Sequence, residues 1–133
     1  MSALVPSDVH HAASRGWLEQ RATDQLLVAP ALLLPEVASA VSRATGRPLL
    51  ARRAVLLLLR LPALRIVAVD AELAEAAARL AGDQRLRGVD SVYVALAKRL
   101  SLPLVTWDLE QASRASEVIH AGPPARPMGK YTP

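Results

Sequence analysis

The sequence contains no cysteine among its 133 residues. Disulfide bonds and thiolate metal sites are therefore excluded, and the composition fits a reducing cytoplasm, where we expect the protein. Long apolar runs are also missing, because Arg60 and Pro62 end the run over residues 54–59 before it could span a bilayer. Residues 1–6 lack the basic start and the long apolar core of a signal peptide. We therefore expect no membrane partner.

Lysine is scarce, since the 16 basic residues comprise 14 arginines and 2 lysines, and the net charge is +4. The planar guanidinium of arginine binds phosphate through two parallel hydrogen bonds, so this excess favours a phosphate-rich partner. A genome-wide preference for arginine explains the same count equally well, and both interpretations stay open. Hydrophobic residues make up 52% of the chain, which excludes disorder over most of it and suits one compact domain.

Hydrophobic periodicity and turn residues predict alternating strands and helices, which indicates an α/β fold with a mainly parallel sheet flanked by helices. We predict a domain over residues 1–120 and a Pro- and Gly-rich tail over residues 121–133. In the first half, the predicted elements are a helix opened by Ser7 or Asp8, a strand at 25–29, and helices at 35–46 and 48–61. A strand at 64–69 and a helix at 71–82 follow, before a Gly82-Asp83 turn. Within residues 87–108 we predict a short helix that the Ser101-Leu102-Pro103 break ends and a strand at 104–107, followed by a turn and short helix within 109–116 and an edge strand at 117–120.

Residues 87–108 form the most informative stretch. An apolar face repeats at three- and four-residue steps up to Leu100, Pro103 breaks the helix, and residues 104–107 suit a buried strand. Asp90 lies in the first helical turn and Asp108 follows the strand. In parallel sheets ligands bind at the carboxyl ends of strands, so this pattern indicates a site there.

This stretch resembles the C-terminal half of the PIN domain, the ribonuclease fold of many bacterial toxins of toxin–antitoxin pairs (the VapC-like group). The residues that carry the resemblance are Asp90, the run Val94-Ala95-Leu96-Ala97, the break Leu102-Pro103, the strand Leu104-Val105 and the ending Thr106-Trp107-Asp108. The family also has a glutamate at a strand–loop–helix junction, which Glu36 matches. The resemblance implies a three-layer PIN-like fold.

By this resemblance Glu36, Asp90 and Asp108 are the catalytic residues and the metal ligands, and the metal is Mg²⁺ or Mn²⁺. Hard divalent cations of this kind prefer oxygen ligands. The implied activity is endoribonuclease cleavage of RNA as a type II toxin. The implied partners are a cognate antitoxin, which covers the acidic cleft, and a second copy of the chain.

The sequence departs from the family pattern at its start. The family opens with an apolar strand that ends in aspartate, and residues 2–5 resemble the segment just after that aspartate. The strand and its aspartate would lie before Met1, so either the start is assigned too late or this is a decayed or truncated member, and both interpretations stay open. Asp8 is a poor replacement because it lies near the helix start. With one acid fewer, the metal would bind more weakly, so the alternative is a non-catalytic PIN-like module that binds RNA or protein.

Two acids also have purely structural interpretations. Glu36 lies in the first turn of its helix, where any acid complements the helix dipole. Asp70 follows a strand, as the phosphoacceptor of a receiver domain does, but N-capping of the next helix explains it fully. The late strand lacks the lysine of a receiver domain, which disfavours that class.

The helix predicted at residues 48–61 is apolar around most of its circumference. A helix of this kind usually has two packing partners. We expect one to be the sheet and the other to be a second subunit or the antitoxin.

Overall fold

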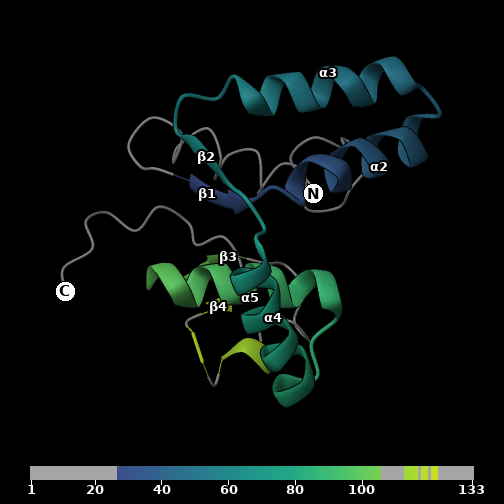
Figure 1. The fold of residues 1–133 in the computed structure, drawn as a ribbon. Coiled ribbons are helices and arrows are strands. Elements are labelled where there is room, and N and C mark those ends of the chain that lie inside the picture. Colours follow the sequence, from purple (N-terminus) through teal and green to yellow (C-terminus); the bar gives the residue numbers. More distant parts are fainter. Residues whose placement is uncertain (1–26, 106–112, 117, 120, 123–133) are drawn as a thin grey trace. The chain divides into compact units, whose positions relative to one another are not determined.

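The structure is a computed structural model that describes residues 27–105, 113–116, 118–119 and 121–122 (Figure 1). The chain divides into two compact units, with the boundary between Ile66 and Val67. The helix predicted after Ser7 or Asp8 and the site residue Asp108 lie outside the described residues.

The first unit consists of strand β1 (Leu27–Pro30), helix α2 (Leu33–Thr45), helix α3 (Pro48–Leu59) and strand β2 (Leu64–Val67). The two strands pair in a two-stranded sheet, and the Leu27 N–H donates to the Ala63 carbonyl at 2.8 Å. One core joins the strands to both helices. Its buried members are Ala29, Leu33, Val37, Val41, Ala51, Ala54 and Leu58, and Leu64 and Ile66 of β2 pack against them.

The chain reverses direction between α2 and α3 because of the residues at the helix ends. Gly46 adopts the left-handed conformation (φ 65°) and its N–H donates to the Ser42 carbonyl at 2.8 Å, which ends α2 as predicted. Pro48 then occupies the start of α3, where its missing N–H costs no hydrogen bond. The two helices therefore lie alongside each other with their buried faces in contact (Figure 1).

The second unit contains helix α4 (Ala71–Gln84), helix α5 (Gly88–Leu100), strand β3 (Leu104–Val105) and strand β4 (Ala121–Gly122). The helices pack against each other, with Leu73 of α4 and Val94 of α5 fully buried. Strand β3 pairs with β4 in parallel, with Leu104 opposite Ala121. Ser101 in the left-handed conformation ends α5, where the sequence predicts the break.

The α/β class is confirmed, and several predicted boundaries are corrected. Helix α2 begins at Leu33, two residues before the predicted start, and α3 ends at Leu59 instead of residue 61. Helix α4 continues through the predicted Gly82 turn to Gln84, and Arg85 ends it in the left-handed conformation. The edge strand predicted at residues 117–120 is wrong for the two of these residues that the structure describes, because the Val118 and Ile119 N–H groups both donate to the Ala115 carbonyl in a turn. Strand β4 follows at Ala121–Gly122.

The described strands form two two-stranded sheets, β1–β2 and β3–β4. Among the described residues, no helix has the length and apolar character needed to cross a membrane.

Asp70 is the N-cap of α4, as the sequence predicts. Its Oδ1 accepts a hydrogen bond from the Leu73 N–H at 2.8 Å. The same oxygen lies 3.6 Å from an Arg99 guanidinium nitrogen, in a pair that is largely exposed to solvent. Exposed pairs of this kind add little to stability, so the cap is the main structural role of Asp70.

We predict that Asp70→Ala lowers the free energy of unfolding by about 0.5–2 kcal/mol, because the Leu73 N–H loses its acceptor. Asp70→Ser keeps an acceptor oxygen and retains most of the stability. The matched control Arg99→Gln removes the ion pair but leaves the cap, and stays within about 0.5 kcal/mol of wild type. Urea unfolding measures all three, and an Asp70→Ala variant as stable as wild type would contradict the capping role.

Candidate functional site

Asp90 lies in the first turn of α5, two residues after the helix begins at Gly88. Its Oδ2 accepts a hydrogen bond from Nε of Arg87, the N-cap residue, at 2.9 Å. The Asp90 side chain is 22% exposed, whereas that of Arg87 is 70% exposed. A half-buried carboxylate thus faces a solvent-exposed guanidinium, so a competing cation could reach the carboxylate without opening the core.

The neighbouring residue fixes this turn. Ser91 is buried, and its hydroxyl donates to the Gly88 carbonyl at 2.6 Å. The Ser91 N–H donates to the Arg87 carbonyl at 2.9 Å. These two hydrogen bonds hold the backbone of the first turn, and with it the position from which the Asp90 side chain extends.

Glu36 lies in the first turn of α2, and the strand–loop–helix junction that the sequence predicts is present. Strand β1 ends at Pro30, a two-residue turn follows, and the helix begins at Leu33. The Glu36 N–H donates to the Leu32 carbonyl at 3.2 Å, and the side chain is half-buried next to the fully buried Val37. Glu36 therefore sits at the margin of the core, as Asp90 does in the second unit.

The third predicted acid, Asp108, lies outside the described residues, three positions after the last residue of β3. Glu36 belongs to the first unit and Asp90 to the second. Within the described part of the chain, no three aspartate, glutamate or histidine side chains gather closely enough to hold a metal ion. The convergence of Glu36, Asp90 and Asp108 on one ion stays a prediction. The donor set consists of carboxylate oxygens, which suit Mg²⁺ or Mn²⁺ better than softer metals.

Sequence reasoning missed two features of the second unit. The first is the pairing of Arg87 with Asp90, whose three-residue spacing at a helix start is the signal that could have revealed it. The second is an open groove of about 400 Å³ between α4 and α5, lined by Arg79, Asp83, Lys98 and Arg99 among others. Its net positive lining could receive an anion, but no residue predicted for the site lines it.

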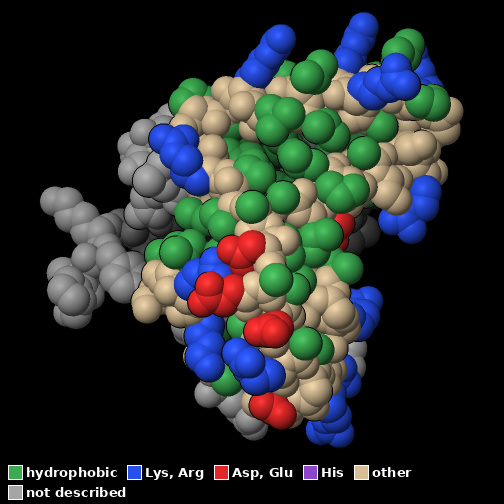
Figure 2. Space-filling view, in the orientation of Figure 1, with side chains coloured by type: hydrophobic (Ala, Val, Ile, Leu, Met, Phe, Trp, Pro, Cys, Tyr) green, Lys and Arg blue, Asp and Glu red, His purple; other side chains and the backbone are tan. Residues whose placement is uncertain are grey.

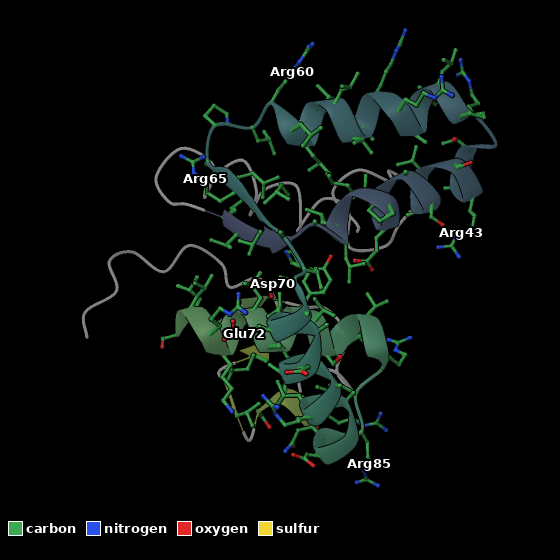
Figure 3. All side chains as sticks on the ribbon, viewed as in Figure 1. Arg43, Arg60, Arg65, Asp70, Glu72 and Arg85 are labelled. Atoms are coloured by element: carbon green, nitrogen blue, oxygen red, sulfur yellow. The ribbon has the colours of Figure 1, made fainter. Side chains whose placement is uncertain are left out.

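Asp70 is not a candidate for phosphoryl chemistry in this structure. One of its carboxylate oxygens accepts from the Leu73 N–H and also lies nearest to Arg99. Figure 3 labels it at the start of α4, next to Glu72 in the first turn. The capping interpretation explains its position without any catalytic role.

Comparison with known proteins adds one finding. A family model described as PIN domain matches residues 1–117, a span that includes Glu36, Asp90 and Asp108. A comparison with curated proteins finds no match.

We predict that Arg87→Gln strengthens divalent-metal binding by up to about fivefold, because an exposed ion pair of this kind contributes roughly 0.2–1 kcal/mol that the metal must overcome. Calorimetric titration with Mn²⁺ measures the affinity. The matched control Arg79→Gln removes an arginine from α4 in the same unit and leaves the affinity unchanged. An equal gain in both variants would mean that net charge, rather than the Arg87–Asp90 pair, sets the affinity.

Proposed function

This chain belongs to the PIN domain family, and we propose that it is a metal-dependent endoribonuclease. PIN domains are typically nucleases that bind RNA and use divalent metal ions. The observation that carries the proposal is the family match over residues 1–117, which contains all three predicted acids. The placement of Glu36 and Asp90, each half-buried in the first turn of a well-packed helix, supports it.

In the proposed site Glu36, Asp90 and Asp108 hold Mg²⁺ or Mn²⁺. The bound ion supplies an activated water for attack on a phosphodiester and stabilises the leaving oxygen. The chain's own contribution is to fix the carboxylates before the metal arrives. Ser91 does this for Asp90 by bracing the first turn of α5, and Val37 does it for Glu36 by anchoring the first turn of α2 in the core.

Arg87 forms an ion pair with Asp90. An exposed guanidinium is displaced readily, because water screens its attraction to the carboxylate. We propose that Arg87 gives up its hydrogen bond to Asp90 when a metal ion binds, and that its positive charge then helps to attract a phosphate of the RNA.

The biological role that we propose is that of the toxin in a type II toxin–antitoxin pair, acting in the cytoplasm. The VapC-like resemblance of residues 90–108 and the excess of arginine over lysine support this role. A cognate antitoxin would hold the enzyme inactive, and a homodimer is the proposed assembly.

A second function is a PIN-like module that binds RNA or protein without cleavage. The observation that favours it is the ion pair of Arg87 with Asp90, which occupies the carboxylate of one predicted metal ligand. Cleavage of single-stranded RNA that depends on Mn²⁺ and on the acids separates the two functions.

We predict that Asp90→Asn and Glu36→Gln each reduce Mn²⁺-dependent RNA cleavage by at least about 10²-fold, because a neutral amide is a much weaker ligand for a hard cation than a carboxylate. The fold should survive, since both side chains lie at the margin of the core. Cleavage of a fluorescently labelled single-stranded RNA measures the activity, and circular dichroism checks the fold.

The chain offers a matched control for Glu36. Glu72 also lies in the first turn of a helix, α4, but it is exposed and follows the capping residue Asp70. Glu72→Gln should therefore cleave RNA at the wild-type rate. If Glu36→Gln and Glu72→Gln lost equal cleavage activity, Glu36 would only complement the helix dipole. If Asp90→Asn cleaved RNA at the wild-type rate, the active site would lie elsewhere.

A further inference from the structure

The outer face of α3 is apolar and exposed. Four leucines on this helix remain accessible to solvent: Leu49 (66% exposed), Leu56 (51%), Leu57 (61%) and Leu59 (54%). The opposite face, formed by Ala51, Ala54 and Leu58, is buried in the core that α3 shares with α2. The expectation that this helix has more apolar surface than its own unit covers is therefore confirmed.

Arginines lie among these leucines on the same outer face. Residues three or four positions apart on a helix lie on one line along it, and one such line alternates between the two residue types: Leu49, Arg53, Leu56 and Arg60. Arg52 lies beside this line and is also exposed. Figure 3 shows Arg60 directed away from α2, and Figure 2 shows hydrophobic and basic side chains interspersed over α3. We call these seven residues the Leu–Arg face: Leu49, Arg52, Arg53, Leu56, Leu57, Leu59 and Arg60.

No acid of the surrounding sequence balances this charge. Between Glu36 and Asp70 the chain has six arginines and neither aspartate nor glutamate. In the described part of the structure, the guanidinium groups of Arg52, Arg53 and Arg60 have no hydrogen-bond or ion-pair partner. Arg43 and Arg65, by contrast, donate to backbone carbonyls of their own segments. The Leu–Arg face thus presents unpaired cations within an apolar surface.

The unpaired arginines make a second copy of the chain an unfavourable partner for the Leu–Arg face. A twofold dimer places the same patch on both sides of the interface, so the face opposite Arg53 and Arg60 would offer arginines and leucines but no acid. Like charges brought together in an interface repel each other and destabilise the complex. The homodimer proposed above would therefore use another surface.

The interspersed pattern also disfavours a bilayer and RNA. Helices that lie on membranes separate their basic face from their apolar face, whereas here the arginines stand between the leucines. Inserting the leucines would carry guanidinium groups into the hydrocarbon. An RNA backbone would satisfy the arginines but would leave four leucines without an apolar partner.

We propose that the Leu–Arg face binds an acidic amphipathic segment of a different protein, in which leucine- or valine-type side chains are flanked by aspartate and glutamate. Such a segment buries the exposed leucines and gives each guanidinium a carboxylate, the partner for which its planar geometry is best suited. The proposal does not require that the domain cleave RNA, because none of the seven residues belongs to the proposed acidic site.

The test uses a panel of fluorescently labelled helical peptides of about 15 residues, long enough to follow the length of α3. Leucines at helical spacing form one face, and glutamates flank it. A matched panel has lysine in place of every glutamate. Fluorescence anisotropy with the full chain should show that the best glutamate peptide binds at least about tenfold more tightly than any lysine peptide, and that added salt weakens it.

Charge reversal makes the test specific. The double variant Arg53→Glu, Arg60→Glu should lose at least about tenfold in affinity for the glutamate peptide and should gain affinity for its lysine counterpart. Leu56→Ser should weaken binding without changing the charge preference. Arg79→Glu, which makes the same change on α4, should bind as wild type does. All four positions are exposed, so the variants should fold, and circular dichroism checks this.

Other results would overturn the proposal. Equal binding of glutamate and lysine peptides, or no binding of any glutamate peptide, would contradict it. So would a dimer in light scattering that the double variant dissociates, or a preference for phosphatidylglycerol vesicles or oligouridine that the same variant abolishes. Asp90→Asn should bind the glutamate peptide normally, so a failure of RNA cleavage leaves this test unaffected.

Discussion

Burial of the residue next to each acid is the constraint on which the proposed chemistry depends. Successive residues on a helix point about 100° apart, so a fully buried neighbour fixes the rotation of the helix and places the acid at the edge of the core. Val37 does this for Glu36, and Ser91 does it for Asp90. Both acids are half-buried as a result: held in place, yet open to water and ions. If the apolar stripes of α2 or α5 shifted by one residue, the acids would turn either fully outward or into the core.

The structure also separates its charges along the sequence. Arginine is the only charged residue type between Glu36 and Asp70. The second unit contains residues of both charges, and it pairs Arg87 with Asp90 and Arg99 with Asp70. A single-sign field attracts partners of opposite charge and accelerates their encounter. The excess of arginine, ambiguous in the sequence, therefore has a local meaning on α3, whatever its origin in the genome.

The sequence predicted the helices well because their signals are strong and local. The apolar stripes of α2 and α5, the Gly46 stop and the Asp70 cap each rest on a few neighbouring residues. It failed at Gly82, since a single glycine costs a helix only about 1 kcal/mol and the burial of Leu80 and Ala77 supports the turn before it. It also misplaced β4, because a strand of two residues has no periodicity to detect and depends on its partner β3.

For the proposed site, the sequence indicated the types of residue and their places at helix starts, which the structure describes for Glu36 and Asp90. It did not indicate that Arg87 neutralises Asp90, because whether a side chain three residues away turns toward a carboxylate depends on the conformation of the N-cap. Convergence of the acids is a property of tertiary structure, and no spacing along the chain determines it. The family resemblance supplied that expectation, and only cleavage and metal-binding measurements test it.

Interspersing arginine with leucine on α3 resolves a conflict between binding and solubility. Exposed leucines at this density form a patch that favours nonspecific association of the free protein. Arginines placed between them break the apolar surface and make two copies repel each other. The same guanidinium groups attract an acidic surface. One set of side chains therefore both keeps two copies of the chain from associating and selects the proposed acidic partner. A helix with its leucines and arginines on opposite faces would have neither property.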